Sequence, residues 1–191
     1  MNKSIMIVGV GGQGTLLASR ILGNVLLAEG YDVKLSEVHG MSQRGGSVVT
    51  YVKYGDKVWS PIVGKGEADL LLAFEQLEAA RYLSYLKPEG KIVVNTQRID
   101  PMSVLAGDGA YPDGVLEALE AAGAAVQRVD ALPLAVEAGS PKAVNVVLIG
   151  AMAKNTDIDK EKWLAAVRAC VPPKFAELNE RAFMLGYEKG E

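Results

Sequence analysis

Short apolar runs alternate along the chain with longer stretches in which apolar residues recur every three or four positions. Residues 4–9 form an apolar run closed by glycines, which is typical of a buried parallel strand. Residues 13–29 place their leucine, isoleucine and valine residues at helical spacing, and Gly30 follows as a stop signal. The alternating residues 32–38 predict a second strand. Together these elements form a β-α-β unit, for which we expect a right-handed crossover.

A hairpin is predicted after this unit. Residues 47–54 and 57–60 read as strands, and Gly55-Asp56 between them is a two-residue turn signal. Such a hairpin makes the sheet mixed rather than purely parallel. Further strands are predicted at 69–74, 91–95 and 126–131, and helices at 75–86, 114–123, 141–154, 159–170 and 173–189. The sequence therefore predicts an α/β protein: a single three-layer α/β/α sandwich over residues 1–191, with a mixed, mostly parallel sheet and a helical C-terminus.

The composition narrows the class of protein. Hydrophobic residues make up 49% of the chain and charged residues 23%, and the net charge of −3 argues against a nucleic-acid-binding surface. One cysteine, Cys170, cannot supply an iron–sulfur cluster or a structural zinc site, so no metal site is predicted. The N-terminus reads as a strand rather than a signal peptide, and the longest apolar run, 144–153, is about half a membrane span. We expect a cytoplasmic protein that binds no membrane.

The turn after the first strand is the first candidate site. Residues 9–14, GVGGQG, have the G-x-G-x-x-G spacing, which lets backbone approach a ligand and leaves N–H groups for an anion at a helix start. Glu37 stands where a dinucleotide-binding fold keeps its ribose-binding acid. Gln13 adds a side-chain amide to the turn, and no second nucleotide-binding half is evident. The pattern leaves NAD or FAD binding and a purely structural turn open.

The segment after the second strand holds two further candidates. His39 is the only histidine and could act as an acid or base, because imidazole titrates near neutral pH. Glu37 lies two residues before it and could face the same side. Arg44 precedes Gly45-Gly46 and could clamp a carboxylate or phosphate with two hydrogen bonds. A structural histidine and a solvated arginine are the competing interpretations.

Three other features are weaker signals. Residues 107–109, GDG, match the start of a thiamine-diphosphate motif, but no asparagine follows at the required spacing. Glu75 and Glu78 lie one helical turn apart, and a solvated helix face with Arg81 is a better interpretation than a catalytic pair. Asn145 lies at an apolar helix start, where a buried amide needs partners, so we expect it to bind a neighbouring loop or a partner chain.

Four segments together carry a resemblance that covers the whole chain: IVGVGGQGTLLASRILG, SEVHGMSQRGGSVVTYVKYG, ADLLLAFEQLEAARYL and VNVVLIGAMA. They resemble the gamma-type domain of the thiamine-dependent 2-oxoacid:ferredoxin oxidoreductases. The Glu-Val-His-Gly-Met-Ser-Gln-Arg-Gly-Gly form of residues 37–46 is most similar to the beta subunits of the indolepyruvate branch of that family.

The resemblance implies an oxidoreductase subunit that is inactive alone. The reaction it implies decarboxylates a 2-oxoacid such as indolepyruvate or another aryl pyruvate, forms an acyl-coenzyme A and reduces ferredoxin. It also implies that a large partner subunit carries thiamine diphosphate, Mg and 4Fe-4S clusters, so this chain alone would bind no cofactor and coenzyme A would be a co-substrate. The family fold is a three-layer sandwich with a mixed sheet.

In that setting, the turn 11–14 and the loop 39–46 are expected to lie together at the ends of neighbouring strands and to dock against the active site of the partner. The candidates for catalysis are His39, Arg44 and Glu37. The expected binding residues are Gly11, Gly12, Gln13, Gly14, Ser42, Gln43, Arg44, Gly45, Gly46 and Asn145. Two alternatives stay open: a stand-alone NAD(P)- or FAD-dependent enzyme, and a non-catalytic scaffold subunit.

Overall fold

A mixed six-stranded sheet forms the centre of the protein, in the strand order β2-β3-β1-β4-β5-β6. The structure is a computed structural model, and it describes residues 2–39 and 45–190. The strands are β1 (Lys3–Val10), β2 (Asp32–His39), β3 (Ser47–Gly55), β4 (Ala68–Ala73), β5 (Leu86–Asn95) and β6 (Ala125–Val129). Strand β3 pairs antiparallel with both β1 and β2, and the other paired strands run parallel. The predicted mixed, mostly parallel sheet is confirmed.

The mixed sheet arises from a different hairpin than the one predicted. The expected second strand, residues 57–60, is not a strand. The Val58 amide instead donates a hydrogen bond to the carboxylate of Asp32 at 2.9 Å, and Trp59 is exposed. Strand β3 already has partners on both sides, so no position beside it is left for a further strand. The predicted Gly55-Asp56 hairpin is therefore wrong, and β3 separates the two strands of the predicted β-α-β unit.

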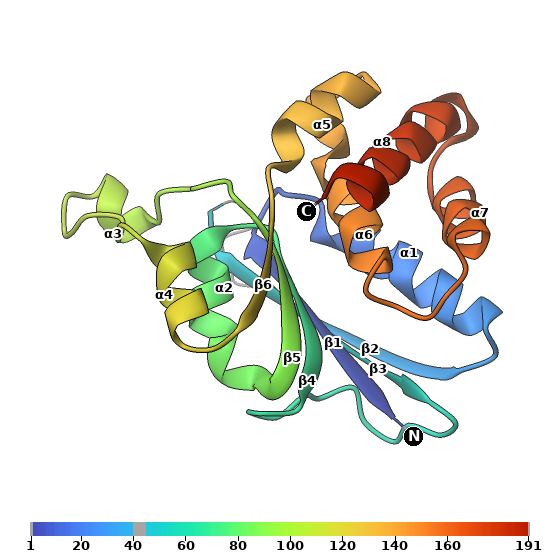
Figure 1. Cartoon of the computed structure of the whole chain (residues 1–191), viewed down its shortest axis with the longest axis horizontal. Helices are drawn as coiled ribbons and strands as arrows, with labels where there is room; N and C mark the ends of the chain where they lie inside the picture. Colours follow the sequence, from blue (N-terminus) through green and yellow to red (C-terminus); the bar gives the residue numbers. More distant parts are fainter. Residues whose placement is uncertain (1, 40–44, 191) are drawn as a thin grey trace.

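Helices cover both faces of the sheet in three layers (Figure 1). Helices α1, α5, α6, α7 and α8 gather on one face, and α2 and α4 lie on the other. The bounds are α1 (Thr15–Ala28), α2 (Gln76–Tyr82), α3 (Met102–Leu105), α4 (Val115–Ala121), α5 (Ala131–Ala138), α6 (Val144–Ala153), α7 (Lys160–Cys170) and α8 (Ala176–Lys189). The three-layer sandwich with a helical C-terminus is thus confirmed, while its extent as one domain stays a prediction. Among the described residues, no helix is long and apolar enough to cross a membrane.

Three helices and one strand differ from the predicted pattern. The sequence did not indicate α3 or α5, because neither is long enough to show helical periodicity. The helix expected at 75–86 ends at Tyr82 and continues as a single 3-10 turn. Strand β5 already begins at Leu86, before the apolar run 91–95, and passes through Pro88. These differences lie where short or irregular elements carry no periodic signal.

Helix α6 is the centre of the larger core. Its residues 145–153 are all buried, as expected of a helix that is apolar on every side. Gly150 and Gly186 allow α6 and α8 to approach backbone to backbone. A Cβ atom at Gly150 would overlap the carbonyl oxygen of Phe183, and one at Gly186 would overlap that of Val147. This close contact fixes α6 against α8. The first turn of α6 lies next to the glycine turn that follows β1, because Asn145 binds the Gly14 carbonyl oxygen.

The helical glycines provide a matched test of this contact. Gly186→Ala should lower the free energy of unfolding by about 1–3 kcal/mol, because the new methyl group overlaps the backbone of α6, which cannot move aside locally. Gly23→Ala in α1 is the control, since a Cβ there has no atom within 4 Å. The control should be neutral or stabilising by up to about 1 kcal/mol. Chemical denaturation measures both values, and equal stabilities for the two variants would contradict the close contact.

Candidate functional site

β1 and β4 are neighbours in the sheet, but the connections that leave their carboxyl ends lead to opposite sides of it. After β1 the chain passes through α1 to β2 on one side, and after β4 it passes through α2 to β5 on the other side. In open α/β sheets, ligands bind in the crevice outside such a switch point. The glycine turn at 11–14 follows β1 at this position, so the sheet topology and the sequence motif indicate the same place.

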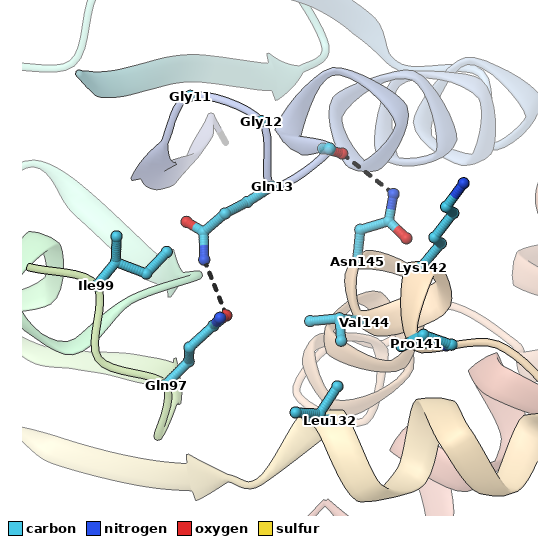
Figure 2. Close-up of a pocket in the computed structure, with 11 residues that line it drawn as sticks. Gly11, Gly12, Gln13, Gln97, Ile99, Leu132, Pro141, Lys142, Val144 and Asn145 are labelled. Carbon is cyan, nitrogen blue, oxygen red and sulfur yellow. Dashed lines mark hydrogen bonds between the residues drawn. The ribbon is translucent and has the colours of Figure 1, made fainter. Parts of the chain in front are cut away.

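Gln13 joins three segments at the switch point (Figure 2). Its side-chain oxygen accepts a hydrogen bond from the Val10 amide at 2.8 Å. Its side-chain nitrogen donates to the carbonyl oxygen of Phe74 at 2.9 Å and to the side-chain oxygen of Gln97 at 3.2 Å. The amide therefore links β1, the end of β4 and the segment after β5. Its oxygen and nitrogen are already engaged within the chain, so the Gln13 side chain shapes the turn.

Asn145 ties the glycine turn to the start of α6. Its side-chain nitrogen donates a hydrogen bond to the Gly14 carbonyl oxygen at 3.3 Å (Figure 2). Gly14 has a φ of 82°, in the left-handed region, and a Cβ atom there would lie 2.6 Å from the Asn145 nitrogen. Only glycine satisfies both constraints. The expected contact of Asn145 with a neighbouring loop is confirmed.

The described end of the loop 39–46 lies beside the glycine turn. The Gly11 amide donates to the Gly46 carbonyl oxygen at 2.9 Å, and the Gly45 amide donates to the Gly11 carbonyl oxygen at 3.4 Å. The expectation that turn and loop lie together is therefore confirmed for Gly45 and Gly46. The other loop candidates, Ser42, Gln43 and Arg44, lie outside the described residues, and their roles stay predictions.

A pocket of about 690 Å³ opens at this edge between the glycine turn and the first turns of α5 and α6. Its walls are formed by Gly11, Gly12, Gln13, Gly14, Gln97, Ile99, Leu132, Pro141, Lys142, Val144 and Asn145. Figure 2 shows Gln13 and Gln97 on one side, and Asn145 and Lys142 on the other. Gly11, Gly12, Gln13, Gly14 and Asn145 were expected here from the sequence. The pocket-lining residues outside the glycine motif were missed, apart from Asn145, because they come together only through the fold.

The pocket combines several groups that favour an anion. The amide N–H groups of Gly12, Gly14 and Thr15 have no hydrogen-bond acceptor in the part of the chain that the structure describes. They stand at the start of the 14-residue helix α1, where the helix dipole adds a partial positive charge. Lys142 is the only cationic side chain among the described residues that line the pocket. Leu132 and Val144 add apolar groups to the wall that also carries Asn145 and Lys142 (Figure 2).

Two of the acid–base candidates, Glu37 and His39, belong to β2. Glu37 accepts a hydrogen bond from the Ser19 hydroxyl of α1 at 2.7 Å, and it is not among the described residues that line the pocket. His39 is the last residue of β2 and is aligned with Val48 of β3, but its side chain is outside what the structure describes. Because β3 separates β2 from β1, Glu37 does not occupy the strand next to the glycine turn, as a ribose-binding acid does.

Two carboxylates that were expected on a solvated helix face are buried instead. Glu75 is 1% exposed and Glu78 is 4% exposed. Glu75 caps α2 by accepting from the Glu78 amide at 3.0 Å, and it also accepts from the Ile99 amide and the Tyr111 hydroxyl. The spacing of an acid three residues before a second acid, directly after a strand, resembles a capping box and was the signal available in the sequence. The solvated-face interpretation was wrong because these caps lie beneath neighbouring segments.

The Glu78 carboxyl has a raised pKa. Burial raises the pKa of the Glu78 carboxyl above its ordinary value of 4.5, and the nearby Glu75 carboxylate adds to this effect. The Ser47 hydroxyl, which donates to Glu78, and the Arg81 guanidinium oppose it. Burial and the hydrogen bond to Glu75 also raise the pKa of the Tyr111 hydroxyl, so that hydroxyl remains a proton donor.

Replacing Glu78 by glutamine should remove part of the pH dependence of stability. Since the folded-state pKa of Glu78 is raised, its contribution is fully present below the unfolded-state pKa, near 4.5, and is lost as the pH rises through the folded-state pKa. The free energy of unfolding, measured by urea denaturation from about pH 4 to about pH 8, should therefore fall less steeply with pH in Glu78→Gln. Parallel profiles for the two proteins would show that Glu78 is not responsible.

Comparisons with known proteins agree with the fold. Residues 4–189 match the protein family described as pyruvate ferredoxin/flavodoxin oxidoreductase. The chain is 44% identical to the indolepyruvate oxidoreductase subunit IorB of Thermococcus kodakarensis, over 96% of this chain and 93% of that protein. It also superimposes on the gamma subunit of the keto/oxoacid ferredoxin oxidoreductase of Geobacter sulfurreducens, with a TM-score of 0.73, 29% identity and 98% of each chain covered.

The same fold also occurs as part of a larger chain. The 2-oxoglutarate:ferredoxin oxidoreductase of Magnetococcus marinus, solved with 2-oxoglutarate, coenzyme A and succinyl-CoA bound, matches with a TM-score of 0.72. The sequence identity is 18%, and the match covers 97% of this chain but only 30% of that one. The architecture described here therefore occurs both as a separate subunit and as one portion of a longer polypeptide.

Proposed function

The chain belongs to the pyruvate ferredoxin/flavodoxin oxidoreductase family as a subunit of a 2-oxoacid:ferredoxin oxidoreductase, and we propose that its substrate is indolepyruvate or another aryl pyruvate. In the proposed reaction the 2-oxoacid loses CO2, its acyl group is joined to coenzyme A, and the two electrons released pass to ferredoxin. The indolepyruvate oxidoreductase subunit from Thermococcus supports this choice of substrate class, since it aligns with nearly the whole chain.

We assign thiamine diphosphate, Mg and the 4Fe-4S clusters of this enzyme to a larger partner subunit. An iron–sulfur cluster needs several cysteine thiolates. This chain has one cysteine, Cys170, whose sulfur accepts a hydrogen bond from Asn24 of α1 at 3.2 Å. The chemistry of thiamine diphosphate is to stabilise the carbanion formed when the oxoacid loses CO2. The residues of this chain would bind and orient the co-substrate, and the chain alone would be inactive. A cytoplasmic location stays a prediction.

The pocket beside the glycine turn is the observation that supports the assignment of coenzyme A to this chain. Coenzyme A carries several phosphate charges, and phosphates bind well to unpaired backbone N–H groups at a helix start. The N–H groups of Gly12 and Gly14 and the ammonium group of Lys142 supply complementary charge around one pocket of about 690 Å³. That volume is in the usual range for small-molecule sites. The apolar side chains of Leu132 and Val144 suit the uncharged part of the ligand.

The stand-alone dinucleotide enzyme and the non-catalytic scaffold differ from the proposed function in what they predict for this pocket. A stand-alone dinucleotide enzyme would need an acid beside the glycine turn, whereas Glu37 contacts Ser19 and is separated from β1 by β3. A non-catalytic scaffold would leave the pocket without a ligand, so substitutions there would change assembly but not the affinity for coenzyme A. Kinetics of the assembled enzyme separates the three.

Lys142→Ala should raise the KM for coenzyme A by about tenfold or more, because a charge-assisted contact to phosphate is lost. The variant is produced together with its partner subunit, and reduction of ferredoxin is followed with indolepyruvate and coenzyme A as substrates. The KM for the oxoacid and the yield of complex should change little. Arg44→Ala tests the neighbouring loop in the same assay.

Lys154→Ala, at the far end of α6, is the matched control and should behave like the unaltered enzyme. If Lys142→Ala and Lys154→Ala have the same KM for coenzyme A, the pocket does not bind its phosphates. Should Arg44→Ala leave both activity and assembly unchanged, the proposed docking of the loop against the partner is wrong.

A further inference from the structure

Residues 96–114 form an arm that leaves the sheet after β5 and returns to α4 (Figure 1). The short helix α3 lies on this 96–114 arm, away from the two helical layers (Figure 1). Met102 and Leu105 of α3 are 65% and 67% exposed. They are three residues apart in a helical turn, so their side chains lie on the same side. Two large apolar side chains at the tip of a projection are typical of a protein contact surface.

The base of the 96–114 arm is firmly attached. The buried carboxylate of Glu75 accepts hydrogen bonds from both legs, one from the Ile99 amide at 3.2 Å and one from the Tyr111 hydroxyl. Tyr111 also accepts from the Leu77 amide at 3.1 Å. The Arg98 guanidinium lies 4.3 Å from the centre of the Tyr111 ring. Because both legs are fixed to the end of β4 and the start of α2, the arm presents its tip in a defined place, which lowers the entropy cost of binding.

The tip is apolar with an acidic border. Asp100 and Asp108 are exposed on either side of α3, and residues 99–110 contain no lysine, arginine or histidine. Arg98, at the base, pairs with Asp113 at 3.3 Å. A complementary surface would therefore offer an apolar socket with cationic side chains around it.

We infer that the 96–114 arm docks through Met102 and Leu105 into an apolar socket, bordered by cations, on the larger partner subunit. The inference rests on the proposed function, which requires such a partner. Gln97 and Ile99 at the base of the arm also line the candidate pocket, so a partner that completes the pocket must lie next to the arm. A second copy of this chain would carry the same acidic border and the same net charge of −3, which disfavours it as the occupant.

The first test removes the apolar groups. Purified Met102→Ser/Leu105→Ser is titrated with the separately purified partner subunit, and binding is measured by calorimetry. The dissociation constant should rise at least about tenfold, as expected when buried contact residues are truncated. Leu27→Ser/Ile62→Ser is the matched control, because these side chains are 61% and 55% exposed and lie outside the 96–114 arm, in α1 and between β3 and β4. Thermal unfolding monitored by circular dichroism shows that both variants are folded. Equal affinity of the arm variant and the unaltered chain would overturn the inference.

The second test addresses the acidic border. Asp100→Asn/Asp108→Asn should slow association with the partner several-fold at low salt and reduce the salt dependence of the rate, because steering by opposite charges is lost. A faster association, or an unchanged salt dependence, would overturn the assignment of cations to the socket.

These results can be separated from the proposed function. If the Lys142 substitution does not affect coenzyme A while the arm variant fails to bind the partner, the pocket assignment is wrong and the docking inference stands. Sedimentation of this chain alone tests the competing occupant. If Met102→Ser/Leu105→Ser abolishes a homodimer and leaves partner affinity unchanged, the arm binds a second copy and the inference is wrong.

Discussion

The close contact between Gly14 and Asn145 determines how the helical layer meets the edge of the sheet. The Asn145 amide donates to the Gly14 carbonyl oxygen at 3.3 Å, and a Cβ atom at position 14, where φ is 82°, would lie 2.6 Å from the Asn145 nitrogen and displace it. This contact joins the first turn of α1 to the first turn of α6. The buried backbone contact at Gly150 and Gly186 holds α6 from its other side. The candidate pocket exists because these contacts bring two helix starts to the switch point of the sheet.

The polar groups at this edge divide into two sets. Gln13 and Glu75 are engaged in holding β1, the end of β4 and the segment after β5 together, so they build the site rather than act in it. The N–H groups of Gly12 and Gly14 and the side chain of Lys142 have no such task among the described residues. This division suits a subunit that offers a rigid anion-binding surface to chemistry carried out on a partner chain.

Sequence patterns predicted the layers, the glycine turn and the need of Asn145 for a hydrogen-bond partner, because each depends on a local signal: buried strands, glycine spacing, or an amide in an apolar helix. That this partner is the glycine turn was not predicted, since the sequence left a neighbouring loop and a partner chain open. The sequence patterns failed where a residue contacts another residue that is distant in the sequence. The Gly55-Asp56 turn signal was overridden because β3 pairs on both sides. The sequence predicts a solvated face for Glu75 and Glu78, whereas Tyr111 and Ser47 donate hydrogen bonds to them in the fold. Lys142 and Gln97 reach the pocket only through the fold, so no local pattern could indicate them.

The central claim is that the glycine turn of this subunit holds the phosphates of coenzyme A in the assembled enzyme. Amide hydrogen exchange of Gly12, Gly14 and Thr15, compared in the complex with and without coenzyme A, tests it most directly. The structure predicts that exchange at these amides slows at least about tenfold when coenzyme A is added, since each N–H group gains an acceptor. Exchange rates that are the same with and without coenzyme A would contradict the claim.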